Sequence, residues 1–246
     1  MDLFEYTRQL NADKTAPLAA RMRPETLDEF VGQKQIVGKG KMLYRAITAD
    51  NLSSVIFYGP PGTGKTTLAR IIANTTKRYF VQINATTAGI KDIKDVVSAA
   101  KDRLAFSGSK TILFIDEIHR FNKTQQDALL PHVEDGTIIL IGATTENPYF
   151  EVNKALVSRS IIFELEQLKT EDIAQLIRRA VTDEKKGYGN FDIKISEEAI
   201  EFIADTANGD ARTALNAIEL AVLSTPKNEK GEIVIDLSTA EDCIQK

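Results

Sequence analysis

The residues from Gly59 to Thr66 form the segment with the clearest chemistry, and they read Gly-Pro-Pro-Gly-Thr-Gly-Lys-Thr. They match the phosphate-binding pattern G-x-x-x-x-G-K-[ST], between an apolar run over residues 54–58 and a helical run over residues 67–72. Glycines let a backbone wrap around a polyphosphate, and the amides and dipole of the following helix attract the anion. Lys65 can reach the β- and γ-phosphates, and the hydroxyl of Thr66 can ligate magnesium.

This match in a strand–loop–helix setting favours a nucleotide-phosphate site over a glycine-rich turn of purely structural role. The residues expected to bind the nucleotide here are Gly59, Pro60, Pro61, Gly62, Thr63, Gly64, Lys65, Thr66 and Thr67.

A second acidic site follows the apolar run over residues 111–115, which ends in Asp116 and Glu117. Carboxylates at the carboxyl end of a parallel strand lie at the crevice where ligands bind. We expect Asp116 to hold the magnesium and Glu117 to polarise the water that attacks the γ-phosphate. Two adjacent acids favour a hydrolase over a small-molecule kinase, which has less use for a water activator. The two histidines, His119 and His132, show no metal-ligand spacing and are assigned to surface or packing roles, with His119 a minor candidate for signalling between subunits.

The elements that must position these residues alternate between strands and helices. Apolar runs that suit strands covered on both faces occur over residues 54–58, 79–83, 111–115, 137–141 and 160–165. Between the second and third run, apolar residues at helical spacing predict a helix around residues 93–104. This order predicts an α/β fold with a parallel sheet between helices.

After Leu165 the pattern predicts a small helical domain. A helix capped by Thr170, a second beginning at Ser196, a third over residues 211–218 and a capping-box start at residues 238–241 follow one another. The expected organisation is an N-terminal extension over residues 1–16, expected to be flexible, a nucleotide-binding domain over residues 17–165 and a helical lid over residues 166–246. Because the last helix begins so close to Lys246, we expect the sequence to be a fragment of a longer protein.

Composition excludes several classes of protein. The formal net charge of −4 gives no global basic field for nucleic acid, and the single cysteine, Cys243, allows no internal disulfide. The N-terminus carries acids and no apolar signal core, and no apolar run approaches the roughly 18 residues that a membrane span needs. We expect a soluble, cytoplasmic protein without a membrane partner.

Taken together, the motifs resemble the AAA+ ATPases, and specifically the bacterial replication-associated recombination protein A family, whose eukaryotic relative is the Werner-helicase-interacting ATPase. The resemblance extends from Pro17 onward, and its most family-specific part is residues 142–148 followed by residues 156–160. It implies a P-loop AAA+ αβα sandwich with a five-stranded parallel sheet and an all-helical lid. It also implies a bacterial, nucleoid-associated, DNA-dependent ATPase of replication-fork maintenance, recombination and repair that uses ATP and Mg²⁺.

The resemblance assigns further residues. It implies that Thr145 helps to position the attacking water, with Thr144 a credible substitute, and that Arg159 is an arginine finger for a neighbouring subunit. It implies that Arg212 is a second sensor that contacts the nucleotide from the lid. The adenine-side residues it implies are Arg21, Arg23, Pro24, Val31 and Gly32.

A finger that acts on a neighbouring subunit implies a homo-oligomer, and in this family the oligomerisation region lies beyond residue 246. The resemblance also implies DNA partners (forks, gaps or single-stranded ends) and replication proteins such as single-strand-binding protein. The residues mark DNA contact poorly, because Lys91, Lys94, Lys101 and Arg103 alternate with Asp92, Asp95 and Asp102 in a mixed-charge face.

Two alternatives remain in view, and a third is rejected. A clamp-loader-type ATPase subunit fits the Ser-Arg-Ser motif around Arg159, and a nucleotide-gated scaffold without turnover belongs to a different class. Intact Lys65, Glu117 and Arg159 argue against the scaffold. A protein unfoldase needs an aromatic pore loop after the second strand, and residues 83–89 contain no aromatic residue.

Overall fold

A computed structural model describes residues 16–244, which divide into two compact units. We call Pro24–Glu166 the sheet unit, and the remainder, up to Arg23 and from Gln167, the helical unit. The sheet unit contains α3 (Lys34–Val37), α4 (Met42–Thr48), β1 (Val55–Tyr58), α5 (Lys65–Thr76), β2 (Tyr79–Asn84), α6 (Ile90–Ser107), β3 (Thr111–Asp116), the 3₁₀ turn η1 (Ile118–Arg120), α7 (Lys123–Glu134), β4 (Ile138–Thr144), α8 (Pro148–Glu151), α9 (Lys154–Val157) and β5 (Ile161–Glu164).

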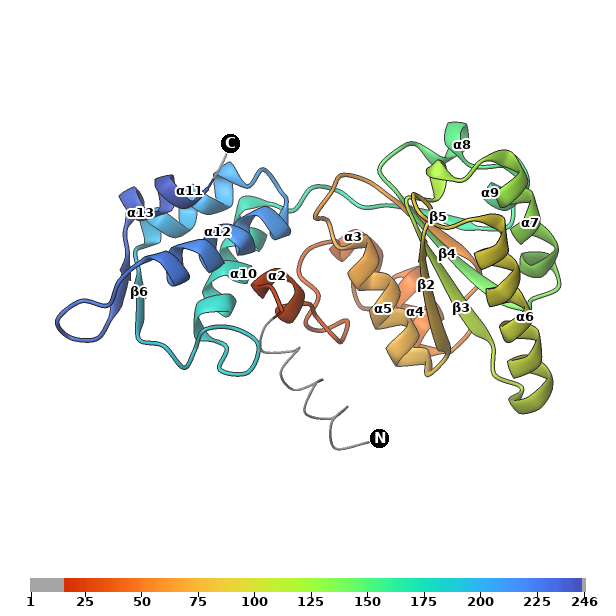
Figure 1. The fold of residues 1–246 in the computed structure, drawn as a ribbon, viewed down its shortest axis with the longest axis horizontal. Helices are drawn as coiled ribbons and strands as arrows, with labels where there is room; N and C mark the ends of the chain where they lie inside the picture. Colours follow the sequence, from red (N-terminus) through yellow and green to blue (C-terminus); the bar gives the residue numbers. More distant parts are fainter. Residues whose placement is uncertain (1–15, 245–246) are drawn as a thin grey trace. The chain divides into compact units, whose positions relative to one another are not determined.

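Within this unit the strands form one parallel sheet in the order β2-β3-β4-β1-β5 (Figure 1). The register pairs Val55 of β1 with Ile141 of β4 and Ile161 of β5. The described residues therefore form the five-stranded parallel α/β sheet that the sequence predicts, with strand ends that differ by at most three residues from the predicted runs.

The expectation that every strand is covered on both faces holds for the three central strands alone. β1, β3 and β4 are almost wholly buried, whereas β2 and β5 are partly exposed because they form the two edges of the sheet. Tyr79 at the start of β2 is 51% exposed. The apolar run over residues 79–83 therefore predicted the strand correctly but its coverage wrongly.

Each face of the sheet packs against its own helices, because alternate residues of a strand point to opposite sides. One face, with Phe57 and Phe114, packs against α4 and α5, and the other, with Leu113 and Leu140, packs against α6, α7 and the segment around α9. Figure 1 shows α5 and α6 on opposite sides of the strands. The helix predicted around residues 93–104 is α6, whose buried residues include Ile93, Val97 and Ala100.

The helical unit contains α2 (Leu18–Arg21), α10 (Thr170–Thr182), α11 (Glu197–Thr206), α12 (Ala211–Ser224) and α13 (Leu237–Cys243). Ser196, the predicted start of the second helix, is the N-cap of α11, its side chain accepting the amide proton of Ala199. The structure corrects two other caps. Thr170 is the first residue of α10 rather than its cap, and α13 is capped by Asp236 instead of starting at residues 238–241.

The expectation of an all-helical lid is wrong in one respect. β6 (Ile193–Ile195) and β7 (Ile233–Ile235) pair as a short parallel sheet within the helical unit. Each strand has only three residues, so a period-2 pattern has too little length to stand out in the sequence. The pairing joins the segment before α11 to the segment that follows α12.

The boundary at residue 17 also differs between prediction and structure. The prediction places residues 17–165 in one domain, whereas α2 belongs to the helical unit, where the amide of Leu18 donates to Glu219 Oε1 of α12 at 2.9 Å. The predicted N-terminal extension lies almost wholly outside the described residues. Among residues 16–244, no helix has the length and apolar character to cross a bilayer.

The packing of the sheet gives a first testable prediction. Phe114 is fully buried in β3 and its ring stacks on Phe80 with centroids 6.0 Å apart. Phe114→Ala should lower the free energy of unfolding by about 3–5 kcal/mol, because it leaves a cavity that the core cannot refill. Phe106 on α6 is 95% exposed, so Phe106→Ala is the matched control and should stay within about 0.5 kcal/mol. Urea denaturation followed by circular dichroism measures both, and equal losses would contradict this core assignment.

Candidate functional site

The segment between β1 and α5 is a loop whose backbone needs glycine at defined points. Gly59, Gly62 and Gly64 have φ angles of 143°, 71° and 98°, which L side chains rarely adopt. A Cβ on Gly59 would lie 2.1 Å from the carbonyl oxygen of Leu165, and one on Gly64 would lie 2.7 Å from the ring of Phe30. The loop therefore has the close backbone approaches that a phosphate cradle requires.

The ammonium group of Lys65 lies inside this loop. Its Nζ donates to the carbonyl oxygens of Gly59 and Pro60, each at 2.7 Å, and the residue is 8% exposed. Thr63, which is 1% exposed, donates its hydroxyl proton to the same Pro60 oxygen at 2.9 Å. These bonds hold the loop in its curved form and leave a buried positive charge at its centre.

Thr66 and Thr67 lie in the first turn of α5, which begins at Lys65. The N-cap residue is Gly64, so no side chain caps the helix. Both threonines are half-buried. The amides of a first helical turn have no partner within the helix, so they are available to an anion.

At the other end of the loop, Tyr58 is hydrogen-bonded to Glu164 of β5, which raises the pKa of the Tyr58 phenol and keeps it protonated.

The strand order brings the predicted acids to the same end of the sheet as this loop, where the parallel strands terminate. β4 lies between β1 and β3, so the carboxyl end of β4 separates the phosphate loop from Asp116, the last residue of β3. Thr144, the last residue of β4, accepts the amide proton of Gly59 on its carbonyl oxygen at 3.2 Å. The ends of three adjacent parallel strands thus supply the loop, a threonine and a pair of carboxylates at one crevice.

Glu117 has a φ of 55°, in the left-handed region that residues other than glycine, asparagine and aspartate seldom occupy. Strained backbone of this kind is common at functional sites. The conformation directs the chain out of β3 into η1, and the carboxylate of Glu117 is 34% exposed. Glu117 is therefore accessible to a water molecule at the crevice.

The structure distinguishes the two threonines that the sequence left open. Thr144 is fully buried, and its Oγ1 accepts the amide proton of Glu146 at 2.9 Å and lies 2.8 Å from His119 Nδ1. Thr145 is exposed and lies one residue beyond the strand. Thr144 is thus the threonine whose side chain contacts other residues of the site, and which of the two positions the attacking water stays a prediction.

His119 is the main residue that sequence reasoning underestimated. Its side chain is 8% exposed and lies at the site, with Nδ1 3.4 Å from Glu117 Oε2 as well as 2.8 Å from Thr144 Oγ1. His132 lies in α7, as expected, 3.8 Å from Asp135. The only sequence signal for His119 was its place two residues after Glu117, in a turn that the sequence does not specify.

Asn84 is another residue that the sequence analysis did not select. It ends β2 directly beside Asp116 in the register, and the amide of Ala85 donates to the Asp116 carbonyl at 3.0 Å. The Asn84 side chain is engaged with the amide and hydroxyl of Thr86 at 2.9 and 2.7 Å. It fixes the turn that follows the edge strand at this crevice.

Two of the predicted adenine-side residues lie next to the phosphate loop. Val31 and Gly32 follow Phe30, whose ring packs at Gly64, and precede Gln33, which is 5% exposed. Gln33 Nε2 donates to the carbonyl of Glu166 at 2.7 Å, and Gln33 Oε1 accepts the amide proton of Glu166 at 3.1 Å. The segment is therefore held between the start of α5 and the end of β5.

Arg21 and Arg23 belong to the helical unit, and Pro24 is the first residue of the sheet unit. The guanidinium of Arg21 lies over the ring of Tyr188 at 5.1 Å, and the carbonyl of Arg23 accepts from Lys186 Nζ at 3.4 Å. These contacts are with the unit that also contains Arg212. The adenine-side role of the three residues stays a prediction.

Arg159 lies at the end of the sheet where the strands begin, opposite the end that holds the phosphate loop of its own chain. It precedes β5, whose first residue Ile161 pairs with Val55 at the start of β1, whereas the loop follows the end of β1. Its Nη2 pairs with Glu134 Oε1 at 2.5 Å, and the side chain is 41% exposed. A role for Arg159 at a nucleotide therefore requires the nucleotide of another copy.

Arg212 is exposed in the first turn of α12. The turn is fixed by Asp210, whose Oδ1 accepts the amide protons of Arg212 and Thr213 at 2.8 and 3.3 Å. Gly209 before it has a φ of 77°, and a Cβ there would lie 2.9 Å from Gln167. The backbone of this segment is well defined, but the second-sensor role of Arg212 stays a prediction.

The residues present fit a bound nucleotide with magnesium. Within the described residues, no group of three His, Cys, Asp or Glu side chains could hold a metal ion. A magnesium ion usually binds through one or two protein ligands together with substrate phosphates. Such a site uses ligands like the hydroxyl of Thr66, at the start of α5, and the carboxylate of Asp116, at the carboxyl end of β3.

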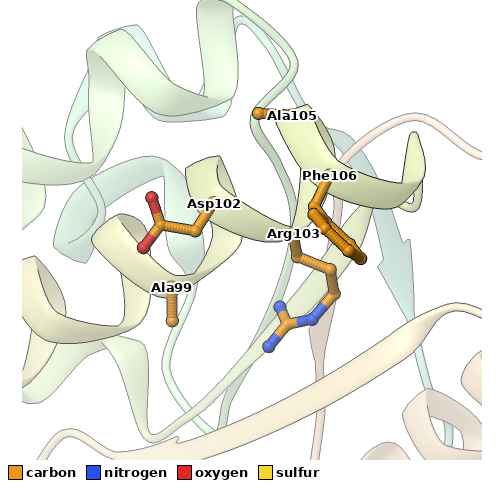
Figure 2. Close-up of a pocket in the computed structure, with 5 residues that line it drawn as sticks. All are labelled: Ala99, Asp102, Arg103, Ala105 and Phe106. Carbon is orange, nitrogen blue, oxygen red and sulfur yellow. The ribbon is translucent and has the colours of Figure 1, made fainter.

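A shallow hollow elsewhere on α6 contains none of the predicted site residues. Figure 2 shows the side chains that line it, which are Ala99, Asp102, Arg103, Ala105 and Phe106. Arg103 lies 3.5 Å from the ring centroid of Tyr79 and donates to Thr111 Oγ1 at 2.7 Å. This basic side chain is therefore engaged within the fold.

Comparisons with known proteins agree with this geometry. The family described as "ATPase family associated with various cellular activities (AAA)" matches residues 55–167, and "AAA C-terminal domain" matches residues 189–246. Replication-associated recombination protein A of Haemophilus influenzae is 51% identical over 88% of this chain and 48% of its own length. The protein of the same name from Bacillus subtilis is 49% identical, over 94% of this chain and 53% of its own.

ATPase WRNIP1 of Dictyostelium discoideum is 44% identical over 92% of this chain and 26% of its own length. Among solved structures, the Thermotoga maritima RuvB Holliday junction branch migration motor has a TM-score of 0.74 at 28% identity, over 91% of this chain and 72% of its own. The chain spans about half the length of the bacterial curated relatives described here.

The phosphate loop gives a second prediction. Gly64→Ala should weaken the binding of a labelled nucleoside triphosphate by at least about tenfold, because the new methyl group meets Phe30 and the residue has a φ of 98°. Gly108 also has a positive φ, 68°, but a Cβ added there would have no atom within 4 Å. Gly108→Ala is therefore the matched control and should keep its affinity. Fluorescence titration measures both; undiminished binding by Gly64→Ala would contradict the cradle.

Proposed function

Because the chain belongs to the AAA ATPases of the replication-associated recombination protein A family, we propose that it is the ATP-hydrolysing part of a DNA-dependent ATPase. Its process is replication-fork maintenance, recombination and DNA repair. One observation carries the ATPase part. The phosphate loop, Thr144 and the pair Asp116–Glu117 meet at the carboxyl ends of three adjacent strands.

In the proposed reaction the loop binds the triphosphate through its backbone amides and Lys65. The ammonium group, which bonds to the carbonyls of Gly59 and Pro60, turns to the β- and γ-phosphate oxygens. The exchange leaves the buried charge paired throughout, because phosphate oxygens replace carbonyl oxygens. The backbone amides at the start of α5 add donors that need no rearrangement.

Glu117 is the proposed acceptor for the proton of the attacking water. Its carboxylate is part-exposed at the crevice, so water can reach it. Thr66 and Asp116 would hold magnesium, which would neutralise charge on the phosphates. Thr144 is proposed to link the phosphate loop to this group of residues, in place of Thr145, because its carbonyl accepts from the amide of Gly59 and its Oγ1 lies 2.8 Å from His119 Nδ1.

Arg159 is proposed to act on the nucleotide of a neighbouring copy. Arg159 lies at the end of the sheet where the strands begin, so it cannot act on a nucleotide in its own loop. Its partner Glu134 keeps the guanidinium oriented at a part-exposed surface. A guanidinium presents a fork of donors suited to the charge that develops on a transferred phosphoryl group. Hydrolysis would then require a homo-oligomer of the whole protein.

DNA is the proposed partner on the strength of the relatives. Their names associate them with replication and recombination, and RuvB is described as a branch migration motor. The formal charge of −4 means that any DNA contact comes from local groups or from other parts of the whole protein. Forked, gapped or single-stranded DNA, single-strand-binding protein and a bacterial cytoplasmic, nucleoid-associated site complete the proposal.

The test of this function is the ATPase rate of the full-length protein with forked, gapped and duplex DNA. We expect DNA to stimulate turnover and the stimulation to fall steeply with salt, because phosphate contacts release counterions. Glu117→Gln should bind ATP with unchanged affinity and hydrolyse it at least about 100-fold more slowly, since the water loses its proton acceptor.

Two results would count against the proposal. Turnover by Glu117→Gln at the unmodified rate would remove Glu117 as the water activator. Hydrolysis that is equal with and without every DNA, at low and high salt, would remove DNA dependence while leaving the ATPase in place.

The finger gives a prediction of its own. Arg159→Ala should bind ATP normally and hydrolyse it about 10³-fold more slowly, the lower end of the range for such residues. Mixing it with Lys65→Ala should restore part of the rate, because a mixed oligomer contains interfaces with one intact loop and one intact finger. Arg178→Ala is a suitable control, since that arginine pairs with Glu197 on the helical unit. No recovery in mixed oligomers of confirmed assembly would show that Arg159 does not act between copies.

A further inference from the structure

We propose that His119 is a positioning residue that couples Thr144 to Glu117 during ATP hydrolysis. The inference rests on the proposed function and adds a member to its site. Three side chains carry it, and their placement follows from two adjacent strand ends and the turn between β3 and α7.

The first step of the argument is that the histidine is fixed in place. η1 is anchored by Ile118, which is fully buried and whose side chain lies 3.2 Å from where a Cβ on Gly142 would stand. The turn is closed by the amide of Arg120, which donates to the Glu117 carbonyl at 2.8 Å. The imidazole of His119 therefore has little freedom to leave the crevice, and its side chain is only 8% exposed.

The second step is that one ring nitrogen faces two partners. His119 Nδ1 lies 2.8 Å from Thr144 Oγ1 and 3.4 Å from Glu117 Oε2. In a neutral imidazole this nitrogen has either a proton or a lone pair. It can therefore accept from the threonine hydroxyl or donate toward the carboxylate, and a strong bond to one partner weakens the other.

The third step concerns the proton of Thr144. Its Oγ1 already accepts the amide proton of Glu146 at 2.9 Å, so the hydroxyl is oriented by a donor on one side. The proton of that hydroxyl has two acceptors in range, His119 Nδ1 at 2.8 Å and the Glu146 carbonyl at 3.4 Å. The shorter contact favours the histidine, which then has no proton at Nδ1 to offer Glu117.

The consequence is a two-state coupling. When Thr144 donates to His119, Glu117 is released to orient a water molecule. When Thr144 turns its proton toward the Glu146 carbonyl at 3.4 Å, the imidazole can lose its Nε2 proton to solvent water and take one from water at Nδ1, and this tautomer can hold the carboxylate. Because the Thr144 carbonyl also accepts from the amide of Gly59, the first residue of the phosphate loop, the state of the loop is linked to the same threonine.

The test uses the full-length protein and separates turnover from binding. His119→Phe keeps the ring volume and removes both nitrogens, and it should lower kcat about tenfold while ATP affinity stays within about twofold. His119→Asn places a side-chain amide near the position of Nδ1 and should recover kcat to within about threefold of the unmodified rate. His132→Phe is the matched control, because that histidine lies on α7 beside Asp135, away from the crevice, and should change neither quantity.

A double-mutant cycle with Thr144→Val tests the coupling itself. If the two side chains act as a unit, His119→Phe in the Thr144→Val background should cost less than about threefold in kcat. Independent, multiplicative losses would overturn the coupling. An unchanged kcat in His119→Phe, or a loss that His119→Asn fails to recover, would overturn the positioning role.

The same experiment distinguishes this inference from the function on which it rests. Hydrolysis by the unmodified protein that is abolished in Glu117→Gln but indifferent to His119→Phe overturns the inference alone. Absence of hydrolysis by the unmodified full-length protein, with every DNA offered, overturns the proposed ATPase function and the inference together.

Discussion

The site depends on the parallel alignment of the strands of the sheet. In a parallel sheet the carboxyl ends of all strands lie at one end of the sheet, so residues far apart in the sequence meet where neighbouring strands terminate. Gly59, Asp116 and Thr144 end or follow three neighbouring strands, and the order β3-β4-β1 fixes which of them are adjacent. The same alignment places Arg159, which precedes β5, at the opposite end of the sheet. One constraint therefore assembles the groups proposed for hydrolysis and separates the proposed finger, Arg159, from them.

The elements carrying the chemistry were largely predictable, because their signals are local. The phosphate loop and the acids after β3 are contiguous motifs, and buried central strands appear in the sequence as apolar runs. The predicted five-stranded parallel fold is confirmed within the described residues. Edge coverage was not predictable in this way, because an apolar run does not reveal whether a strand such as β2 has one neighbour or two.

The residues that the sequence could not settle depend on non-local geometry. Thr144 and Thr145 are adjacent and chemically identical, and only the end of β4 decides which of them is buried. His119 has no motif spacing, and its place beside Thr144 arises from η1 and from the neighbouring strand. Likewise, α2 belongs to the helical unit through contacts with α12, which lies about two hundred residues later in the chain.

The hydrogen bonds at the crevice also explain how the phosphate loop avoids an unpaired buried charge. Lys65 is nearly buried, and an isolated ammonium there would be costly. The carbonyls of Gly59 and Pro60 accept from it, in a loop with positive φ at Gly59, Gly62 and Gly64. A triphosphate would offer stronger, charged acceptors in the same place. In the proposed function, a triphosphate would therefore exchange partners with a loop that is already curved instead of creating the cradle.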